Sequence, residues 1–142
     1  MTDEELLGMA SAARSSAYAP YSGFAVGAAV LAGGRTAVGA NVENASYGLC
    51  LCAERIAIAR AVLEGARRIE AIAVCTSSSP PAMPCGMCLQ TIAEFATDAE
   101  ELRVIAGNTA GEQRVMSLRE LLPHAFSPTS LGQPSAGARS SS

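Results

Sequence analysis

The chain has 142 residues, of which 49% are hydrophobic and 16% are charged, and its formal net charge is −3. This length suits a single domain, and the acidic balance without a basic run argues against duplex DNA or RNA as the main partner. With no Trp, three Tyr and three Phe, the chain also lacks the aromatic residues of a platform that stacks single-stranded bases.

No apolar run has the length needed to cross a bilayer, so no membrane partner is expected. The N-terminus does not show a basic stretch followed by an apolar core, the pattern of a signal peptide, so we expect a cytoplasmic location. In that compartment the five cysteines indicate metal or redox chemistry rather than a disulfide framework.

Hydrophobic periodicity and turn residues predict alternating helices and strands. A capping-box pattern of Thr2 and Glu5 opens the first helix, and the Gly33-Gly34 pair joins the first two strands as a hairpin. The predicted elements, in chain order, are helix 2–13, strands 24–31 and 36–41, helix 52–65, strand 69–76, helix 85–96, strands 102–106 and 113–116, and helix 117–122.

This order of elements predicts an α/β fold. Because strands and helices alternate after the first hairpin, we expect a three-layer α/β/α sandwich with a mixed central sheet of about five strands. Residues 1–126 would form one catalytic domain. Residues 127–142 are rich in Ser, Pro, Gly and Ala, so a disordered C-terminal tail is predicted there.

The most informative motif combines three cysteines with a glutamate. Cys52 is followed two residues later by Glu54, and Cys85 and Cys88 lie in a Pro-Cys-Gly-Met-Cys segment. Catalytic zinc takes three protein ligands and leaves a fourth position for water, and zinc deaminases place a glutamate that is not a ligand beside that position. Both cysteine motifs fall at predicted helix N-termini, whose partial positive charge, together with Arg55, would offset the charge of three thiolates.

A structural zinc site is the main alternative from a different functional class. Cys50 would supply a fourth thiolate, and such a site would stabilise the fold without catalysing a reaction. This reading leaves Glu54 and Arg55 without a role. Cys50 and Cys75 are therefore interpreted as small buried residues, which is the usual environment of a free cysteine.

Six motifs in sequence order resemble the small homotetrameric cytidine deaminases. The resemblance runs from the first helix to about Phe126, and its motifs are Tyr18-Ala19-Pro20-Tyr21-Ser22, Phe24-Ala25-Val26-Gly27-Ala28, Asn41-Val42-Glu43-Asn44-Ala45, Cys52-Ala53-Glu54-Arg55, Pro84-Cys85-Gly86-Met87-Cys88 and Leu121-Leu122-Pro123-His124-Ala125-Phe126.

The resemblance implies a role for each matching residue. It implies that Cys52, Cys85 and Cys88 bind one Zn²⁺ per chain and that Glu54 transfers protons. It also implies that one set of residues contacts a nucleoside substrate: Phe24, Asn41 and Glu43 around the sugar, Ala53 and Glu54 at the pyrimidine, and Phe126 from a neighbouring subunit. Taken singly, Phe24 would be interpreted as core and Asn41 as a turn residue.

The expected function is hydrolytic deamination of cytidine and 2′-deoxycytidine in pyrimidine salvage, by a homotetramer. The same chemistry on a blasticidin-type antibiotic or a modified cytidine is the nearest alternative. Many relatives carry Arg where this chain has Leu89. We therefore expect one positive charge fewer near the thiolates and a less acidic zinc-bound water.

Overall fold

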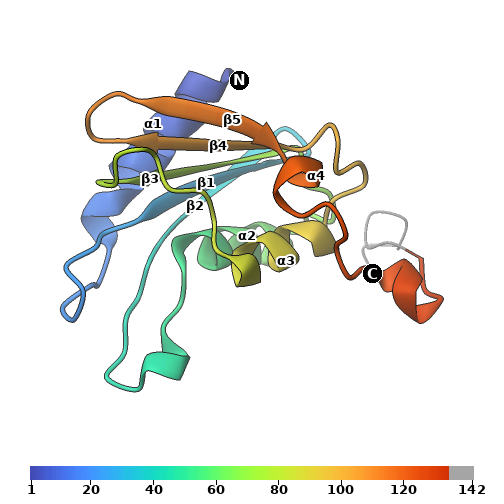
Figure 1. Ribbon diagram of the computed structural model, residues 1–142, viewed down its shortest axis with the longest axis horizontal. Helices are drawn as coiled ribbons and strands as arrows, with labels where there is room; N and C mark the ends of the chain where they lie inside the picture. The colour runs from blue at the N-terminus through green and yellow to red at the C-terminus, as the bar shows by residue number, and fades with distance from the viewer. Residues whose placement is uncertain (135–142) are drawn as a thin grey trace.

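The computed structural model describes residues 1–134. Its centre is a five-stranded sheet in the order β2-β1-β3-β4-β5, with the helices packed on its two faces (Figure 1). The strands are β1 (Gly27–Ala32), β2 (Arg35–Ala40), β3 (Ala71–Thr76), β4 (Arg103–Asn108) and β5 (Gln113–Ser117). The helices are α1 (Asp3–Ala13), α2 (Ala53–Leu63), α3 (Gly86–Glu94) and the single turn α4 (Leu118–Leu121), with 3₁₀ turns η1 (Arg14–Ser16), η2 (Tyr47–Leu49) and η3 (Pro128–Leu131).

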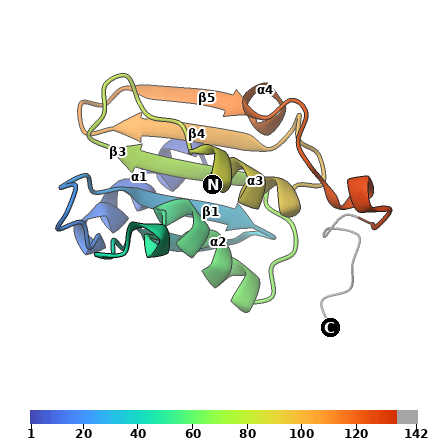
Figure 2. The same ribbon diagram turned by 60° about the horizontal axis from the view of Figure 1, so that its bottom comes forward.

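The sheet is mixed, as the sequence predicts. β1 pairs antiparallel with β2 and β3, β3 pairs parallel with β4, and β4 pairs antiparallel with β5. The parallel pair requires a crossover, and α3 lies in that connection. The expected three-layer arrangement is confirmed, because α1 covers one face of the sheet while α2 and α3 cover the other (Figure 2).

Alternating residues of the inner strands fill the two cores. Val30 on β1 and Ile72 on β3 point into the core under α2 and α3, whereas Ala29 and Ala73 point into the core under α1. This alternation follows from the two-residue period of a strand. Every residue of β3 is buried, so β3 is the central strand in packing as well as in position.

Two glycines allow helices to approach the sheet closely. A Cβ at Gly27 would lie 1.9 Å from the carbonyl oxygen of Ala10 in α1. A Cβ at Gly39 would lie 2.5 Å from the carbonyl oxygen of Ala53 and 2.6 Å from the backbone nitrogen of Ala57, both in α2. The absence of a side chain at Gly39 thus sets the position of the helix that follows Cys52.

Most predicted element boundaries differ from the observed ones by one or two residues, and two of the differences lie at the pocket or at the cysteines. The strand predicted for residues 24–31 begins at Gly27, so the prediction is wrong for residues 24–26. Their backbone is held by the side chain of Asn41, which accepts from Val26 N at 2.8 Å and donates to Phe24 O at 2.8 Å. The helix predicted to start at Cys85 begins at Gly86, with Cys85 as its N-cap.

The domain prediction of residues 1–126 with a disordered tail at 127–142 stays a prediction. Within that tail Pro128–Leu131 forms η3, and Pro128 is buried. Residues 135–142 lie outside the described part of the chain. None of the helices in residues 1–134 is both long enough and apolar enough to cross a membrane.

Candidate active site

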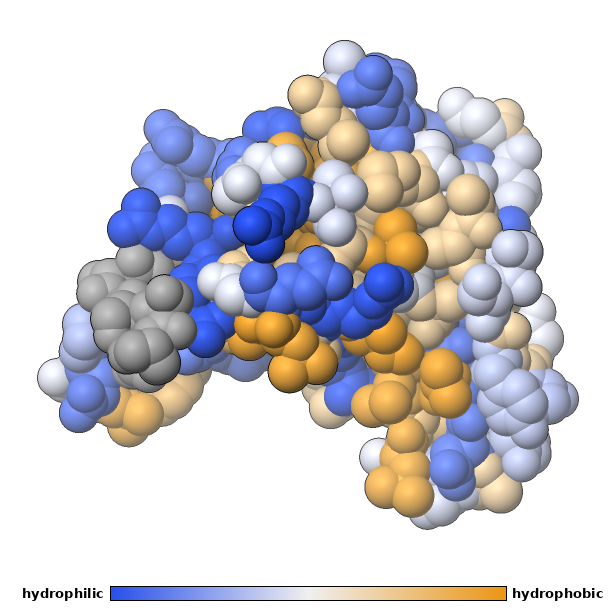
Figure 3. All heavy atoms as spheres, turned by 180° about the vertical axis from the view of Figure 1, so that it is seen from behind, coloured by the Kyte–Doolittle hydropathy of each residue, from blue (hydrophilic) through white to orange (hydrophobic). Residues whose placement is uncertain are grey.

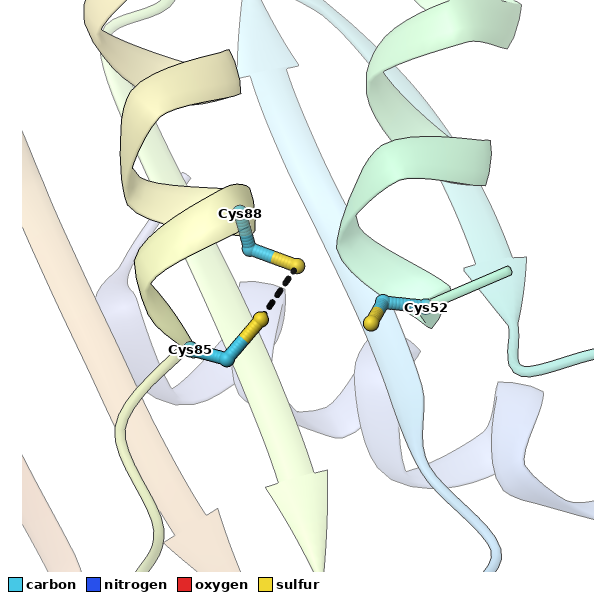
Figure 4. Close-up of side chains that lie close together, drawn as sticks. All are labelled: Cys52, Cys85 and Cys88. Atoms are coloured by element: carbon cyan, nitrogen blue, oxygen red, sulfur yellow. Dashed lines mark hydrogen bonds between the residues drawn. The ribbon is translucent and has the colours of Figure 1, made fainter. Parts of the chain in front are cut away.

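Three cysteine side chains meet where α2 and α3 begin. The sulfur atoms of Cys52, Cys85 and Cys88 all lie within 4.8 Å of one another, and the Cys85 and Cys88 sulfurs are 3.6 Å apart (Figure 4). Cys52 is the N-cap of α2 and Cys85 is the N-cap of α3, while Cys88 lies in the first turn of α3. The sequence prediction that these three thiols converge at helix N-termini is confirmed.

This donor set fits zinc. A tetrahedral ion with Zn–S bonds of about 2.3 Å holds its thiolates about 3.8 Å apart, which is close to the separation of the Cys85 and Cys88 sulfurs. Among residues 1–134 these three cysteines form the one cluster with metal-ligand geometry. Three protein ligands are the number used by catalytic rather than structural zinc.

Cys50 lies outside this cluster. Its thiol accepts a hydrogen bond from the backbone nitrogen of Asn44 at 3.3 Å, and its sulfur lies 3.6 Å from the carbonyl oxygen of the same residue. Its interpretation as a small buried residue is only partly right, because Cys50 is half-buried whereas Cys75 is 1% exposed. The geometry therefore provides no fourth thiolate, which disfavours the structural zinc alternative.

Arg55 provides the positive charge expected beside the thiolates. Its guanidinium donates to the carbonyl oxygen of Cys50 at 3.0 Å and lies 3.8 Å from the Cys52 sulfur. The pKa of the Cys52 thiol is lowered to about 5, mainly by a hydrogen bond from Cys88 and additionally by Arg55, against the opposing effect of burial. The pKa of Cys88 is raised, because its thiol donates to Cys52 and is buried.

Glu54 is a buried carboxyl group next to the cluster. It is 5% exposed and lies in the first turn of α2, two residues after the N-cap Cys52. Burial raises the pKa of Glu54, and the nearby negative charge of Cys52 raises it further. A carboxyl group with a raised pKa is suited to accept and release a proton near neutral pH.

A pocket of about 330 Å³ opens beside Glu54. Of the residues predicted to contact substrate or metal, this pocket brings together seven: Phe24, Asn41, Glu43, Cys52, Ala53, Glu54 and Cys85. Phe126 does not line it. Its side chain is 59% exposed, and its carbonyl oxygen accepts from Gln90 at 2.8 Å. That position leaves the Phe126 ring free to contact another molecule.

The pocket has further lining residues that were not predicted from the sequence to contact substrate. These are Ser22, Val26, Cys50, Leu51, Val74, Thr76, Ala82 and Met83. Val74 and Thr76 were detectable in principle, because they follow the core residue Ile72 at the two-residue spacing of β3. Ala82 and Met83 lie in a Ser/Pro-rich loop, where no periodicity marks a residue as pocket-lining.

Leu89 is 8% exposed and packs in the core under α2 and α3. Leu89 is the residue after Cys88, and its side chain contributes apolar packing rather than charge. The expectation of a less acidic zinc-bound water stays a prediction.

The family model for the cytidine and deoxycytidylate deaminase zinc-binding region matches residues 1–102, which include the three clustered cysteines and Glu54. The chain belongs to this deaminase family. The resemblance seen in the sequence motifs is thereby confirmed.

Individual members of the family are similar over most of their length. The cytidine deaminase of Halalkalibacterium halodurans is 46% identical over 127 residues, covering 89% of this chain and 95% of that protein. That of Sporosarcina psychrophila is 42% identical over 132 residues, covering 92% and 96%. The crystal structure of cytidine deaminase from Burkholderia pseudomallei has a TM-score of 0.83 and 47% identity, and covers 89% of this chain and 100% of that chain.

Proposed function

We propose that this protein catalyses the zinc-dependent hydrolytic deamination of cytidine and 2′-deoxycytidine to uridine and 2′-deoxyuridine, with release of ammonia. The observation that carries the proposal is Glu54, a buried carboxyl group with a raised pKa beside three convergent thiols and a pocket. The relatives named cytidine deaminase support the choice of substrate.

Each part of the site has a chemical role in this reaction. One Zn²⁺ held by Cys52, Cys85 and Cys88 would supply the Lewis acidity that makes water a nucleophile near neutral pH. Glu54 accepts a proton from the attacking water and donates it to the pyrimidine ring nitrogen next to the amino-bearing carbon, which makes that carbon electrophilic. Glu54 then carries the second proton of the water to the amino group, which leaves as ammonia.

The remaining residues bind and orient the nucleoside. Ala53 is buried at the edge of the pocket, and its backbone is assigned to binding the pyrimidine. Asn41 and Glu43 are assigned to the sugar hydroxyls, and Phe24 to the apolar wall beside them. Loss of a hydrogen bond to a charged group such as the Glu43 carboxylate is expected to weaken substrate binding.

The proposal extends to the assembly and its setting. Large apolar side chains are exposed around the loop of η2 and at Phe126, and Figure 3 shows hydrophobic residues gathered on the lobe that η2 forms. We infer a homotetramer in which such surface is covered and Phe126 completes a neighbouring pocket. Light scattering at micromolar concentration tests this, and a monomeric mass would contradict it.

Deamination of free pyrimidine nucleosides is a salvage reaction, and we infer that the protein carries it out in the cytoplasm. Cell fractionation tests this location.

The decisive experiment compares zinc-loaded wild type with Glu54→Gln. Ultraviolet absorbance should show cytidine consumption by the wild type, and the variant should be slower by a factor of about 10²–10⁴ at equal zinc content. A Glu54→Gln variant that keeps most of its activity would contradict the proton-transfer role. Absence of turnover by the wild type would contradict the substrate, and a blasticidin-type antibiotic and modified cytidines would then be assayed.

A further inference from the structure

Residues 21–24, of which Ser22 and Phe24 line the pocket, lie outside the strands and are held largely by hydrogen bonds from side chains. This segment is called the pocket wall below. The backbone nitrogens of Tyr21 and Ser22 donate to Oε1 of Glu43 at 2.9 and 3.1 Å. The carbonyl oxygen of Phe24 accepts from Asn41 at 2.8 Å. The position of this wall therefore depends on the same two side chains that are assigned to the sugar.

Within this wall, the Ser22 hydroxyl links the backbone of Phe24 to the Glu43 carboxylate. Its hydroxyl donates to Oε2 of Glu43 and accepts a hydrogen bond from the backbone nitrogen of Phe24 at 3.0 Å. Ser22, Phe24 and Glu43 all line the pocket. A single hydroxyl group thus links the apolar wall to the carboxylate that faces the substrate.

These contacts leave Glu43 little freedom. Each carboxylate oxygen has two acceptor positions. Oε1 uses both for Tyr21 and Ser22, and Oε2 uses one for the Ser22 hydroxyl. One acceptor position remains, on Oε2, so Glu43 in this arrangement accepts a single further donor.

We propose that Ser22 is a positioning residue that fixes the Glu43 carboxylate and Phe24. The pocket then selects nucleosides in which one of the sugar hydroxyls is placed to donate to Oε2 of Glu43. The inference rests on the proposed deamination of cytidine and deepens it. Without the Ser22 hydroxyl, Oε2 has a second vacant acceptor position and the carboxylate can rotate, so the sugar hydroxyl is held less firmly.

The test measures KM and kcat for cytidine with wild type, Ser22→Ala and Ser22→Thr. A residue that orients a binding group raises KM and leaves kcat unchanged. For Ser22→Ala we expect KM to rise about tenfold or more, as for a hydrogen bond to a charged group, with kcat within about twofold. Ser22→Thr keeps the hydroxyl and should bring KM back to within about threefold of wild type.

Two further comparisons separate this role from a general loss of structure. Ser22→Ala in a Glu43→Ala background should add little, because coupled residues are not additive. The rise in KM should also be smaller for whichever of 2′-deoxycytidine and 3′-deoxycytidine lacks the hydroxyl that Glu43 accepts. Ser11→Ala is the matched control, since Ser11 is exposed on α1, which covers the face of the sheet opposite α2 and α3.

The outcomes distinguish a failure of the Ser22 role from a failure of the proposed cytidine deamination. Intact wild-type turnover with an unchanged KM in Ser22→Ala overturns the role of Ser22 alone. Full additivity with Glu43→Ala, or an equal rise in KM for cytidine and for both deoxy analogues, overturns it as well. Absence of cytidine turnover by wild type overturns the proposed function and this inference together.

Discussion

At the scale of single residues, the cysteines differ in role although they are close in sequence. Cys52 and Cys50 are separated by one residue, yet only Cys52 joins Cys85 and Cys88 in the cluster. The Cys50 thiol is instead bonded to the backbone of Asn44. The difference arises because Cys52 is the N-cap of α2, whereas Cys50 precedes the helix and follows η2.

This difference predicts distinct outcomes for two substitutions. Cys50→Ser should retain about one zinc per chain and most of its activity, because a hydroxyl can replace the thiol in the contacts with Asn44. Cys52→Ser should lose zinc, since a neutral hydroxyl is a poor ligand compared with a thiolate. Metal analysis of both purified variants checks this prediction. Equal loss of zinc in the two variants would restore the four-thiolate reading.

The sequence was informative about residues that carry the chemistry. The thiols and Glu54 were predictable because metal-ligand spacing and a neighbouring carboxylate form a specific pattern, and the structure confirms the convergence of the thiols. The assigned roles of Phe24, Asn41, Glu43 and Ala53 stay predictions, although all four line the pocket. The hydrogen bonds that hold the 21–24 segment were not predictable, because they join residues about 20 positions apart without any periodic signal.

At the scale of elements, the contact between β2 and α2 determines where the site residues lie. Gly39 faces the first turns of α2, in which a Cβ would meet backbone atoms at 2.5 and 2.6 Å. Backbone atoms cannot rotate away as a flexible side chain can. The helix that presents Glu54 must therefore move if this glycine gains a side chain.

Gly39→Ala is accordingly expected to lower the free energy of unfolding by about 1–3 kcal/mol, the usual cost of overpacking, and to weaken zinc retention. Chemical denaturation and metal analysis measure the two effects. Gly8→Ala is the matched control, because a Cβ at Gly8 has no neighbour within 4 Å. In the middle of α1 it should stabilise by about 0.5–1 kcal/mol. Unchanged stability of Gly39→Ala would contradict this account of the packing.

A second contact between elements fastens the loop that leads to Cys85. Ser79 in this loop donates to Oε1 of Glu112 at 2.5 Å, and the buried Asn108 donates to the same oxygen at 3.0 Å and to the carbonyl oxygen of Ser78 at 2.9 Å. Asn108 ends β4, and Glu112 immediately precedes β5. The β4–β5 turn thereby supports the loop that carries Ala82 and Met83.

This contact has a predictable pH dependence. The hydrogen bonds from Ser79 and then Asn108 lower the pKa of Glu112 below its ordinary value of 4.5. Its stabilising contribution is therefore fully present above pH 4.5 and is lost as the pH falls through the lowered pKa. The difference in Tm between wild type and Glu112→Gln should shrink from pH 6 to about pH 3. Glu100→Gln serves as the control, and a constant difference for Glu112→Gln would refute the prediction.

At the scale of the whole molecule, the metal site joins segments that are far apart in sequence. Cys52 begins α2 and Cys85 begins α3, with all of β3 between them in the chain. The succession of elements along the chain is the alternation of helices and strands that the periodicity predicts. The order of the strands within the sheet, with β1 and not β2 beside β3, was not predicted, because periodicity gives no information about which strands are neighbours.

Zinc removal should lower the stability of the entire domain. A ligand that binds only the folded state stabilises it by about 1.4 kcal/mol for each tenfold excess of its concentration over Kd. Chelator-treated protein is expected to unfold at a lower temperature in calorimetry, and added zinc should restore the Tm. Cys88→Ser should show no such response to zinc. A Tm of the wild type that is independent of zinc would exclude this linkage.

The hydrogen bonds of the 21–24 segment have a consequence for protein engineering. Altering Asn41 or Glu43 to accept a different sugar also releases the backbone of Phe24 or of Tyr21 and Ser22, so a new specificity would arrive together with a displaced wall. Ala82 and Met83 also line the pocket, and neither side chain takes part in the hydrogen bonds that hold the 21–24 segment. A library aimed at new nucleobases should therefore vary these two positions first and leave the sugar-facing pair intact.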